Sequence, residues 1–125
     1  MRPKSGGAAM ELKLVIIVLN KVECLEKLLE EFAERNLQGA TILNSHGMMQ
    51  ELSEDDEMRF VLSLRNILNP THKENRTIFM AASSDRVPLI IEAVNKVTGG
   101  LDKADTGILF TVPIDYLEGF KVKKA

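Results

Sequence analysis

Residues 98–107 are the stretch whose side chains and spacing best suit the binding of a small ligand. They read TGGLDKADTG, so three glycines surround two aspartates and one lysine. The members that could contact a ligand are Gly99, Gly100, Asp102, Lys103, Asp105 and Gly107. Glycines let the backbone turn sharply and let an anion approach peptide N–H groups closely, and Lys103 adds a positive charge. A helix C-cap followed by a connecting loop has the same composition, so an anion-binding loop and a plain connection both stay open.

Metal binding and catalysis have less support in the sequence. His46 and His72 are the only histidines, and neither has a partner at the spacing of a metal site. Cys24, the only cysteine, lies beside Glu23 and Glu26, which disfavour a reactive thiolate, so we interpret it as a packing residue. The chain also offers no nucleophile with a base and no paired carboxylates at useful spacing. The sequence therefore predicts no catalytic residue, no metal ligand and no enzymatic activity.

The composition is that of one small domain. The chain has 125 residues, of which 45% are hydrophobic and 27% are charged, which suffices for a single core. The net charge of −2 argues against nucleic-acid binding, because that function needs a basic surface. A single cysteine permits no intrachain disulfide and fits the reducing cytoplasm. No apolar run reaches the length of a membrane span.

The N-terminus is predicted to contribute nothing to function. Residues 1–9 have no periodicity and are interpreted as a disordered leader, so the single domain is expected to cover residues 10–125. Arg2 and Lys4 precede an apolar run as in a signal peptide, but the run at residues 14–19 is short and no cleavage site follows. It is therefore predicted to be a strand.

The first half of the chain alternates strand and helix patterns. Residues 14–19 are β-branched and continuously apolar, which is typical of a central strand. A helical stripe follows, which we expect to end at Gln38 and Gly39, and residues 40–46 are predicted to form a second strand. The stripe consists of Val22, Leu25, Leu28, Leu29 and Phe32.

The second half begins with an unusual insertion. Residues 53–68 are predicted to form a helix that starts at a serine cap with four acidic residues in its first turn, and residues 69–75 to form a loop. Residues 76–82 return to a strand pattern. Residues 84–86 are expected to cap the next helix, with Pro88 in its first turn, and residues 108–113 to form the last strand. The stripe of this helix consists of Leu89, Ile90, Ala93, Val94 and Val97.

This order of elements predicts an α+β fold. It is a ferredoxin-like βαββαβ sandwich with a helical insertion between the second and third strands. Both long helices should cover one face of the sheet. The strands at residues 14–19 and 108–112 are apolar on both sides, so the other face needs a cover, and a further copy of the chain is the simplest candidate.

Two stretches resemble the PII nitrogen-regulatory signalling proteins. Residues 38–47, QGATILNSHG, are similar to the second strand of that family and the base of its long loop, and residues 98–110 with Pro113 to its phosphate-binding loop and last strand. The likeness spans residues 12–120. It implies a cytoplasmic homotrimer with an adenine nucleotide, AMP, ADP or ATP, in each inter-subunit cleft, and a protein partner that meets residues 48–75.

The resemblance also implies a set of nucleotide-binding residues. They are Thr41 and Gly47 on one wall of the cleft, and Gly99, Gly100, Lys103 and Gly107 on the other. The sequence departs from the family in three places. Ile108 replaces a phosphate-binding lysine, only Lys121 remains of a basic pair near Gly119, and residues 48–75 contain no tyrosine for modification. We therefore expect modest affinity, with AMP preferred over ATP.

Other functions remain open on this scaffold, because the ferredoxin-like fold carries many activities. One is an interaction protein that binds no ligand. The other is a metal-responsive protein or an enzyme of the same fold.

Overall fold

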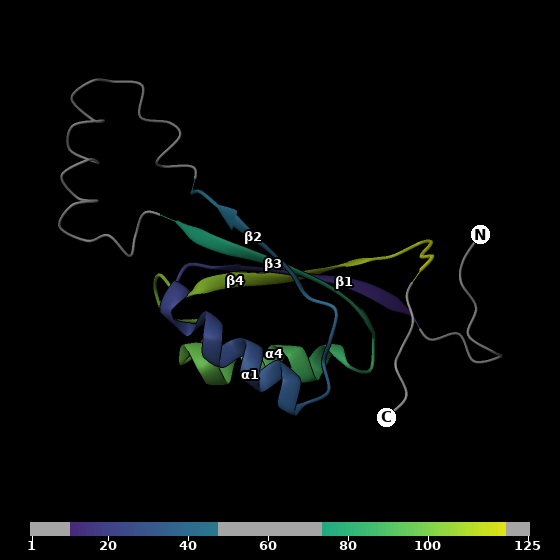
Figure 1. Cartoon of the computed structure of the whole chain (residues 1–125), viewed down its shortest axis with the longest axis horizontal. Helices are drawn as coiled ribbons and strands as arrows, with labels where there is room; N and C mark the ends of the chain where they lie inside the picture. The colour runs from purple at the N-terminus through teal and green to yellow at the C-terminus, as the bar shows by residue number, and fades with distance from the viewer. Residues whose placement is uncertain (1–10, 48–73, 120–125) are drawn as a thin grey trace, which may run out of the picture.

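The computed structural model describes residues 11–47 and 74–119, which form a four-stranded antiparallel sheet with two helices on one face (Figure 1). In chain order the elements are β1 (Leu12–Leu19), the 3-10 turn η1 (Val22–Cys24), α1 (Leu25–Glu34), β2 (Thr41–Ser45), β3 (Asn75–Ser83), α4 (Val87–Thr98) and β4 (Gly107–Pro113). The strand order is β2-β3-β1-β4. This is the ferredoxin-like α+β arrangement, so the predicted fold class is confirmed. The expected leader at residues 1–9 and the expected helix at residues 53–68 lie outside the described residues.

The strand β1 is an interior strand of the sheet, as its apolar run predicts. It pairs antiparallel with β3 from Leu12 to Leu19 and with β4 on its other side, where Leu19 lies opposite Gly107. Its side chains alternate between the two faces, so Val15 and Ile17 are fully buried under the helices. The strand β3 starts at Asn75, which sequence analysis placed in the preceding loop.

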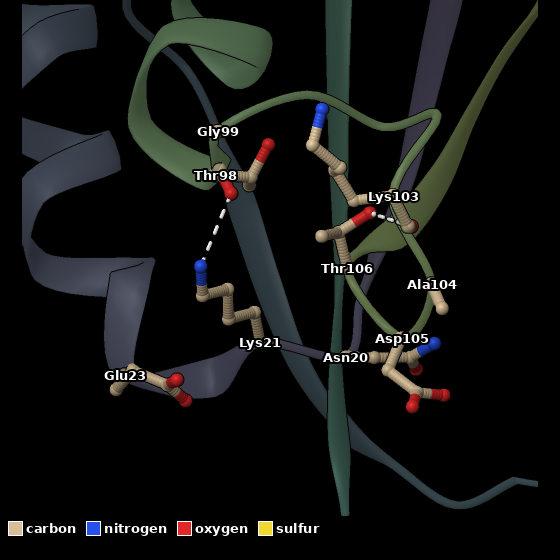
Figure 2. A pocket seen from close by; sticks show the side chains of 9 residues that line it. All are labelled: Asn20, Lys21, Glu23, Thr98, Gly99, Lys103, Ala104, Asp105 and Thr106. Carbon is tan, nitrogen blue, oxygen red and sulfur yellow. Dashed lines mark hydrogen bonds between the residues drawn. The ribbon is translucent and has the colours of Figure 1, made fainter.

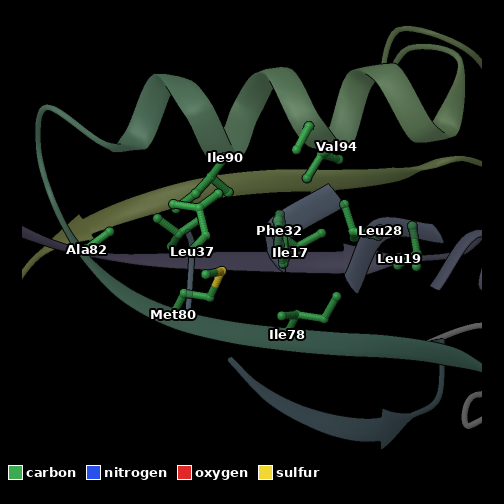
Figure 3. Packing of buried hydrophobic residues seen from close by; sticks show 12 residues of the cluster. Ile17, Leu19, Leu28, Phe32, Leu37, Ile78, Met80, Ala82, Ile90 and Val94 are labelled. Atoms are coloured by element: carbon green, nitrogen blue, oxygen red, sulfur yellow. The ribbon is translucent and has the colours of Figure 1, made fainter. Parts of the chain in front are cut away.

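The core lies between the sheet and the two helices (Figure 3). Its members are Val15, Ile17, Leu19, Leu28, Phe32, Leu37, Ile78, Met80, Ala82, Ile90, Ala93 and Val94. Apart from Leu37, which follows α1, they come from inward positions at a spacing of two in the strands and of three or four in the helices. The two helices have 10 and 12 residues, and no helix in the described part is long and apolar enough to cross a membrane.

The end of α1 differs from the prediction. The helix stops at Glu34, before the predicted Gln38 and Gly39, because Asn36 adopts the left-handed conformation with φ 58°. The N–H of Leu37 donates to the carbonyl of Phe32 at 2.8 Å, and the N–H of Asn36 to that of Ala33 at 3.1 Å. This is a Schellman motif, in which asparagine takes the place that glycine usually holds.

The start of α4 also corrects a prediction. Residues 84–86 supply no side-chain cap, because the N-cap position is Arg86 and no side chain hydrogen-bonds there. Pro88 in the first turn lacks an N–H, so one fewer donor needs a partner. The Arg86 side chain instead donates from Nη2 to the carbonyls of Arg35 and Asn36, both at 2.9 Å. Arg86 thereby fastens the start of α4 to the end of α1.

One member of the predicted α4 stripe, Leu89, is exposed instead of buried. The polar Thr98, the last residue of α4, is buried. Thr98 tolerates burial because its hydroxyl donates to the carbonyl of Val94 at 2.8 Å.

The outer sides of α1 and α4 are joined by ion pairs. Glu31 accepts hydrogen bonds from Arg35 and from Lys96, each with a closest approach of 3.0 Å, and Arg35 also pairs with Glu92. Glu31 and Arg35 belong to α1, while Glu92 and Lys96 belong to α4. The hydrogen bonds from Lys96 and Arg35 lower the pKa of Glu31 below its ordinary value of 4.5.

The protein is therefore expected to lose stability in acid through Glu31. A carboxylate whose folded pKa is depressed stabilises the fold fully above its unfolded pKa, and this contribution disappears as the pH falls through the folded value. The free energy of unfolding, measured by urea titration, should fall as the pH is lowered from about 5 toward 3. The variant Glu31→Gln should show a shallower decline, whereas the exposed Glu30→Gln should behave as the wild type does. Equal slopes in all three proteins would contradict this assignment.

The second face of the sheet carries no helix in the described part (Figure 1). The strand registers place Leu14, Ile16, Val18, Leu43, Phe79, Ala81, Ile108, Phe110 and Val112 on this open face. Three of these β4 side chains keep large exposed fractions, 57% for Ile108, 46% for Phe110 and 40% for Val112. Within residues 11–47 and 74–119, the uncovered apolar face expected from the sequence is thus present.

Candidate functional site

A hollow of about 480 Å³ lies where the turn between β1 and α1 meets the loop between α4 and β4 (Figure 2). Its lining residues are Asn20, Lys21, Glu23, Thr98, Gly99, Lys103, Ala104, Asp105 and Thr106. Because β1 and β4 are neighbours in the sheet, the segments that lead out of one and into the other meet at the same end. The loop singled out by its sequence thus forms one wall of the hollow.

Hydrogen bonds within the loop hold the end of α4 in place. Gly99 ends the helix in the left-handed conformation, φ 89°, and its N–H donates to the carbonyl of Asn95 at 3.1 Å. The N–H of Gly100 donates to the hydroxyl of Thr98 at 3.2 Å, and the N–H of Leu101 to Asn95 Oδ1 at 2.7 Å. The N–H groups of both glycines are therefore engaged inside the loop, and a ligand must displace these bonds or use other groups.

Thr106 joins the loop to the opposite wall. Its side chain is buried and donates to the carbonyl of Lys103 at 2.9 Å, which closes the turn that contains Asp105 in a left-handed conformation, φ 63°. The Thr106 carbonyl accepts from the backbone N–H groups of Asn20 and Lys21 at 3.0 and 3.2 Å. These bonds set the spacing between the two walls.

Both walls contribute a positive charge to the hollow. Lys21 donates from Nζ to the carbonyl of Thr98 at 3.2 Å, where the negative end of the α4 dipole favours a cation (Figure 2). Lys103 is exposed, and its Nζ lies 3.9 Å from the carboxylate of Asp102. Glu23 and Asp105 also line the hollow, so its two lysines are matched by two acids. Such a site suits a ligand of low negative charge.

Sequence analysis did not identify Lys21. The topology could have indicated it. Because β1 runs antiparallel to β4, the end of β1 lies beside the loop that leads into β4. Lys21 stands two residues after the end of β1, in the turn that lies beside residues 98–107.

The residues predicted to bind a nucleotide are only partly brought together within one chain. Gly99 and Lys103 line the hollow, whereas Gly100 and Gly107 do not. Thr41 lies on β2, the edge strand farthest from β4, and Gly47 follows that strand. Since β3 and β1 lie between β2 and β4, a single chain does not place Thr41 and Gly47 on the walls of this hollow.

The glycine at position 107 has a packing role. Gly107 lies opposite Leu19 with φ 147°, and a Cβ there would approach the carbonyl oxygen of Val18 well inside 3.0 Å, a separation that real Cβ atoms essentially never show. A glycine at this point lets β4 begin directly beside β1.

The other candidate groups lie elsewhere. His46 is exposed just after β2, and no group of three or more histidine, cysteine or acidic side chains that could hold a metal occurs in the part of the chain that the structure describes. Cys24 is buried, and its Sγ lies 3.5 Å from the carbonyl of Val97, which agrees with a packing role.

Comparison with known proteins finds similarity in structure alone. No protein-family model matches the sequence, and no curated protein matches it. Among solved structures, a functionally unknown protein from Pediococcus pentosaceus has a TM-score of 0.60 and 20% identity, over 90% of this chain and 100% of that one.

Two PII-type structures show the same degree of likeness. Arabidopsis thaliana PII bound to citrate has a TM-score of 0.60 and 10% identity, over 85% of this chain and 79% of that one. The complex of GlnK from B. subtilis with ATP has a TM-score of 0.58 and 18% identity, over 84% of this chain and 83% of that one. At this level of identity the likeness concerns the fold. The chain therefore has a PII-like fold.

Proposed function

We propose that this chain is a PII-like regulatory protein of the cytoplasm, without enzymatic activity, that binds an adenine nucleotide. The observation that carries the proposal is the hollow between the β1–α1 turn and residues 98–107, lined by lysines from both walls. The PII-like fold supports it, since one neighbour of that fold is a complex with ATP and another is bound to citrate. Both of those ligands are anions, and the lysines are the groups here that favour an anion.

The proposed assembly is a homotrimer that buries the open face. Large apolar side chains on β4 support this, because an apolar surface of this kind rarely stays in contact with water. In such an assembly Thr41 and Gly47 of a neighbouring copy would complete the cleft beside Gly99, Gly100, Lys103 and Gly107. Residues 48–75 are the proposed contact for a protein partner.

The charges of the hollow favour AMP over ATP. Glu23 and Asp105 lie on its walls, so each added phosphate brings more repulsion than two lysines can offset. Lys21 gives one of its three Nζ protons to the Thr98 carbonyl, so only two are left for a phosphate. We expect affinity to decline in the order AMP, ADP, ATP.

Calorimetric titration with AMP, ADP and ATP tests this proposal. Lys103→Ala and Lys21→Ala should each weaken AMP binding roughly tenfold, because each removes one charge-assisted hydrogen bond. The matched control is Lys27→Ala, an exposed lysine of α1 outside the hollow, which should bind as the wild type does.

Two results would count against the proposal. Tight binding of magnesium-ATP that neither lysine variant changes would show that the nucleotide site lies elsewhere. The absence of any nucleotide binding would favour the second candidate, an interaction protein without a ligand, which the open apolar face also supports.

A further inference from the structure

Four polar side chains cross the end of the sheet nearest the hollow. Ser45 is the last residue of β2, Asn75 is the first of β3, and the two lie opposite each other. Thr77 lies two positions further along β3, on the same face as Asn75, and Asn20 directly follows β1. The rest of this face is largely apolar, so these four residues form a distinct polar row.

The polar row is joined by hydrogen bonds that run in one direction. The hydroxyls of Thr77 and Ser45 lie 2.8 Å apart, Ser45 donates to Asn75 Oδ1, and Asn75 donates from Nδ2 to Asn20 Oδ1 at 3.2 Å. A hydroxyl has one proton, so Ser45, which gives its proton to Asn75, accepts from Thr77. In each of these hydrogen bonds the acceptor is therefore the residue nearer to Asn20 in the series.

Asn20 connects this row to the hollow. It lines the hollow, and its backbone N–H is bonded to the Thr106 carbonyl of the opposite wall. Its Oδ1 is used by Asn75, which leaves the two protons of Nδ2 as the next donors in the series. Within residues 11–47 and 74–119, no protein group accepts from Nδ2 of Asn20.

We propose that Asn20 is a positioning residue that transmits occupancy of the hollow to the β2–β3 pair. An anion that accepts from Nδ2 polarises the series and strengthens each bond behind it, because hydrogen bonds that follow one another polarise one another. The ends of β2 and β3 are then held together more tightly when the hollow is filled. This inference rests on the function proposed above.

The coupling must act in both directions. If a ligand strengthens the bond between Ser45 and Asn75, then loss of that bond must weaken the ligand by the same factor. Ser45→Ala lies two links away from the hollow, yet it should raise the dissociation constant of AMP about twofold, since a series strengthens each of its hydrogen bonds by roughly 30% at most. Thr77→Val, which keeps the side-chain shape, should have a smaller effect in the same direction.

The experiment combines calorimetry with amide exchange, and AMP is the probe. In the wild type, saturating AMP should slow exchange at the amides of Ser45 and Thr77 by the same factor, about twofold. In Ser45→Ala the slowing at Thr77 should be lost. The control is Ser83→Ala, at the opposite end of β3, which should match the wild type in both measurements.

The possible failures are distinguishable. If AMP protects residues 103–106 but changes neither Ser45 nor Thr77, and if Ser45→Ala binds AMP as the wild type does, then the relay through Asn20 is wrong and the binding site stands. If AMP protects no part of the hollow in the wild type, the proposed function fails and the relay fails with it.

Discussion

Replacing Phe110 with aspartate is expected to reduce the assembly to single chains. Phe110 lies in the middle of the edge strand β4, on the open face opposite Ile16, and is 46% exposed in one chain. Because just under half of the side chain is exposed in one chain, burying the rest between copies contributes about 0.7–1.4 kcal/mol per subunit, and an unpaired carboxylate in its place adds a desolvation penalty. Light scattering of the wild type at micromolar concentration should give three times the chain mass of 13.9 kDa, and the variant should give that mass itself.

The control for Phe110→Asp is a charge placed on the opposite side of the molecule. Ile91 is an exposed apolar residue of α4, 39% accessible, and Ile91→Asp should leave the oligomer unchanged. Phe110→Leu should preserve it as well, since the side chain stays apolar. A wild type that is monomeric at micromolar concentration would contradict the proposed assembly, whatever the variants do.

Replacing Gly107 with alanine is expected to be the most destabilising small substitution in the described chain. Its φ of 147° is unfavourable for alanine, and the new methyl group would meet the backbone carbonyl of Val18 and the Cα of Leu19. Neither is the end of a flexible side chain, so β4 has to shift away from β1. We expect a loss of about 3 kcal/mol or more in the free energy of unfolding, measured by urea titration.

Gly39→Ala is the control for Gly107→Ala, because it adds the strain of a positive φ without a steric clash of the new methyl group. Gly39 also has a positive φ, 85°, but a methyl group there would contact nothing within 4 Å. It should therefore cost only about 1 kcal/mol, the ordinary penalty for a left-handed alanine. Equal losses for the two variants would mean that the close approach of β4 to β1 does not determine the need for glycine at position 107.

The strands and helices followed from local patterns. The apolar run at residues 14–19 and the spacing of Leu28 and Phe32 each reflect contact with the core at a fixed period, and the structure places these elements where the patterns did. The helix ends were less predictable. Asn36, which carries no strong stop signal, ended α1 earlier than Gly39, because the Schellman bonds and the burial of Leu37 stabilise that end.

The candidate site was predictable only in part. The glycines and charges of residues 98–107 stand together in the sequence, and Gly99 and Lys103 do line the hollow. Lys21 and Asn20 were missed, because they reach the hollow only through the pairing of β1 with β4. The bonds that occupy the Gly99 and Gly100 N–H groups are local, to Asn95 and Thr98, and agree with the helix C-cap that the sequence left open.

The sequence by itself determined the periodic elements, their order, and the excess of apolar side chains that one layer of helices cannot cover. These properties depend on residue type and spacing, because contact with the core recurs at a fixed period along each strand and helix. The tertiary structure alone decided which walls meet around the hollow and which polar atoms are already bonded. It also showed that Asn20 stands at the end of a row that begins on β3. Those properties depend on contacts between residues as far apart as Asn20 and Asn75, and only the pairing of the strands brings such residues together.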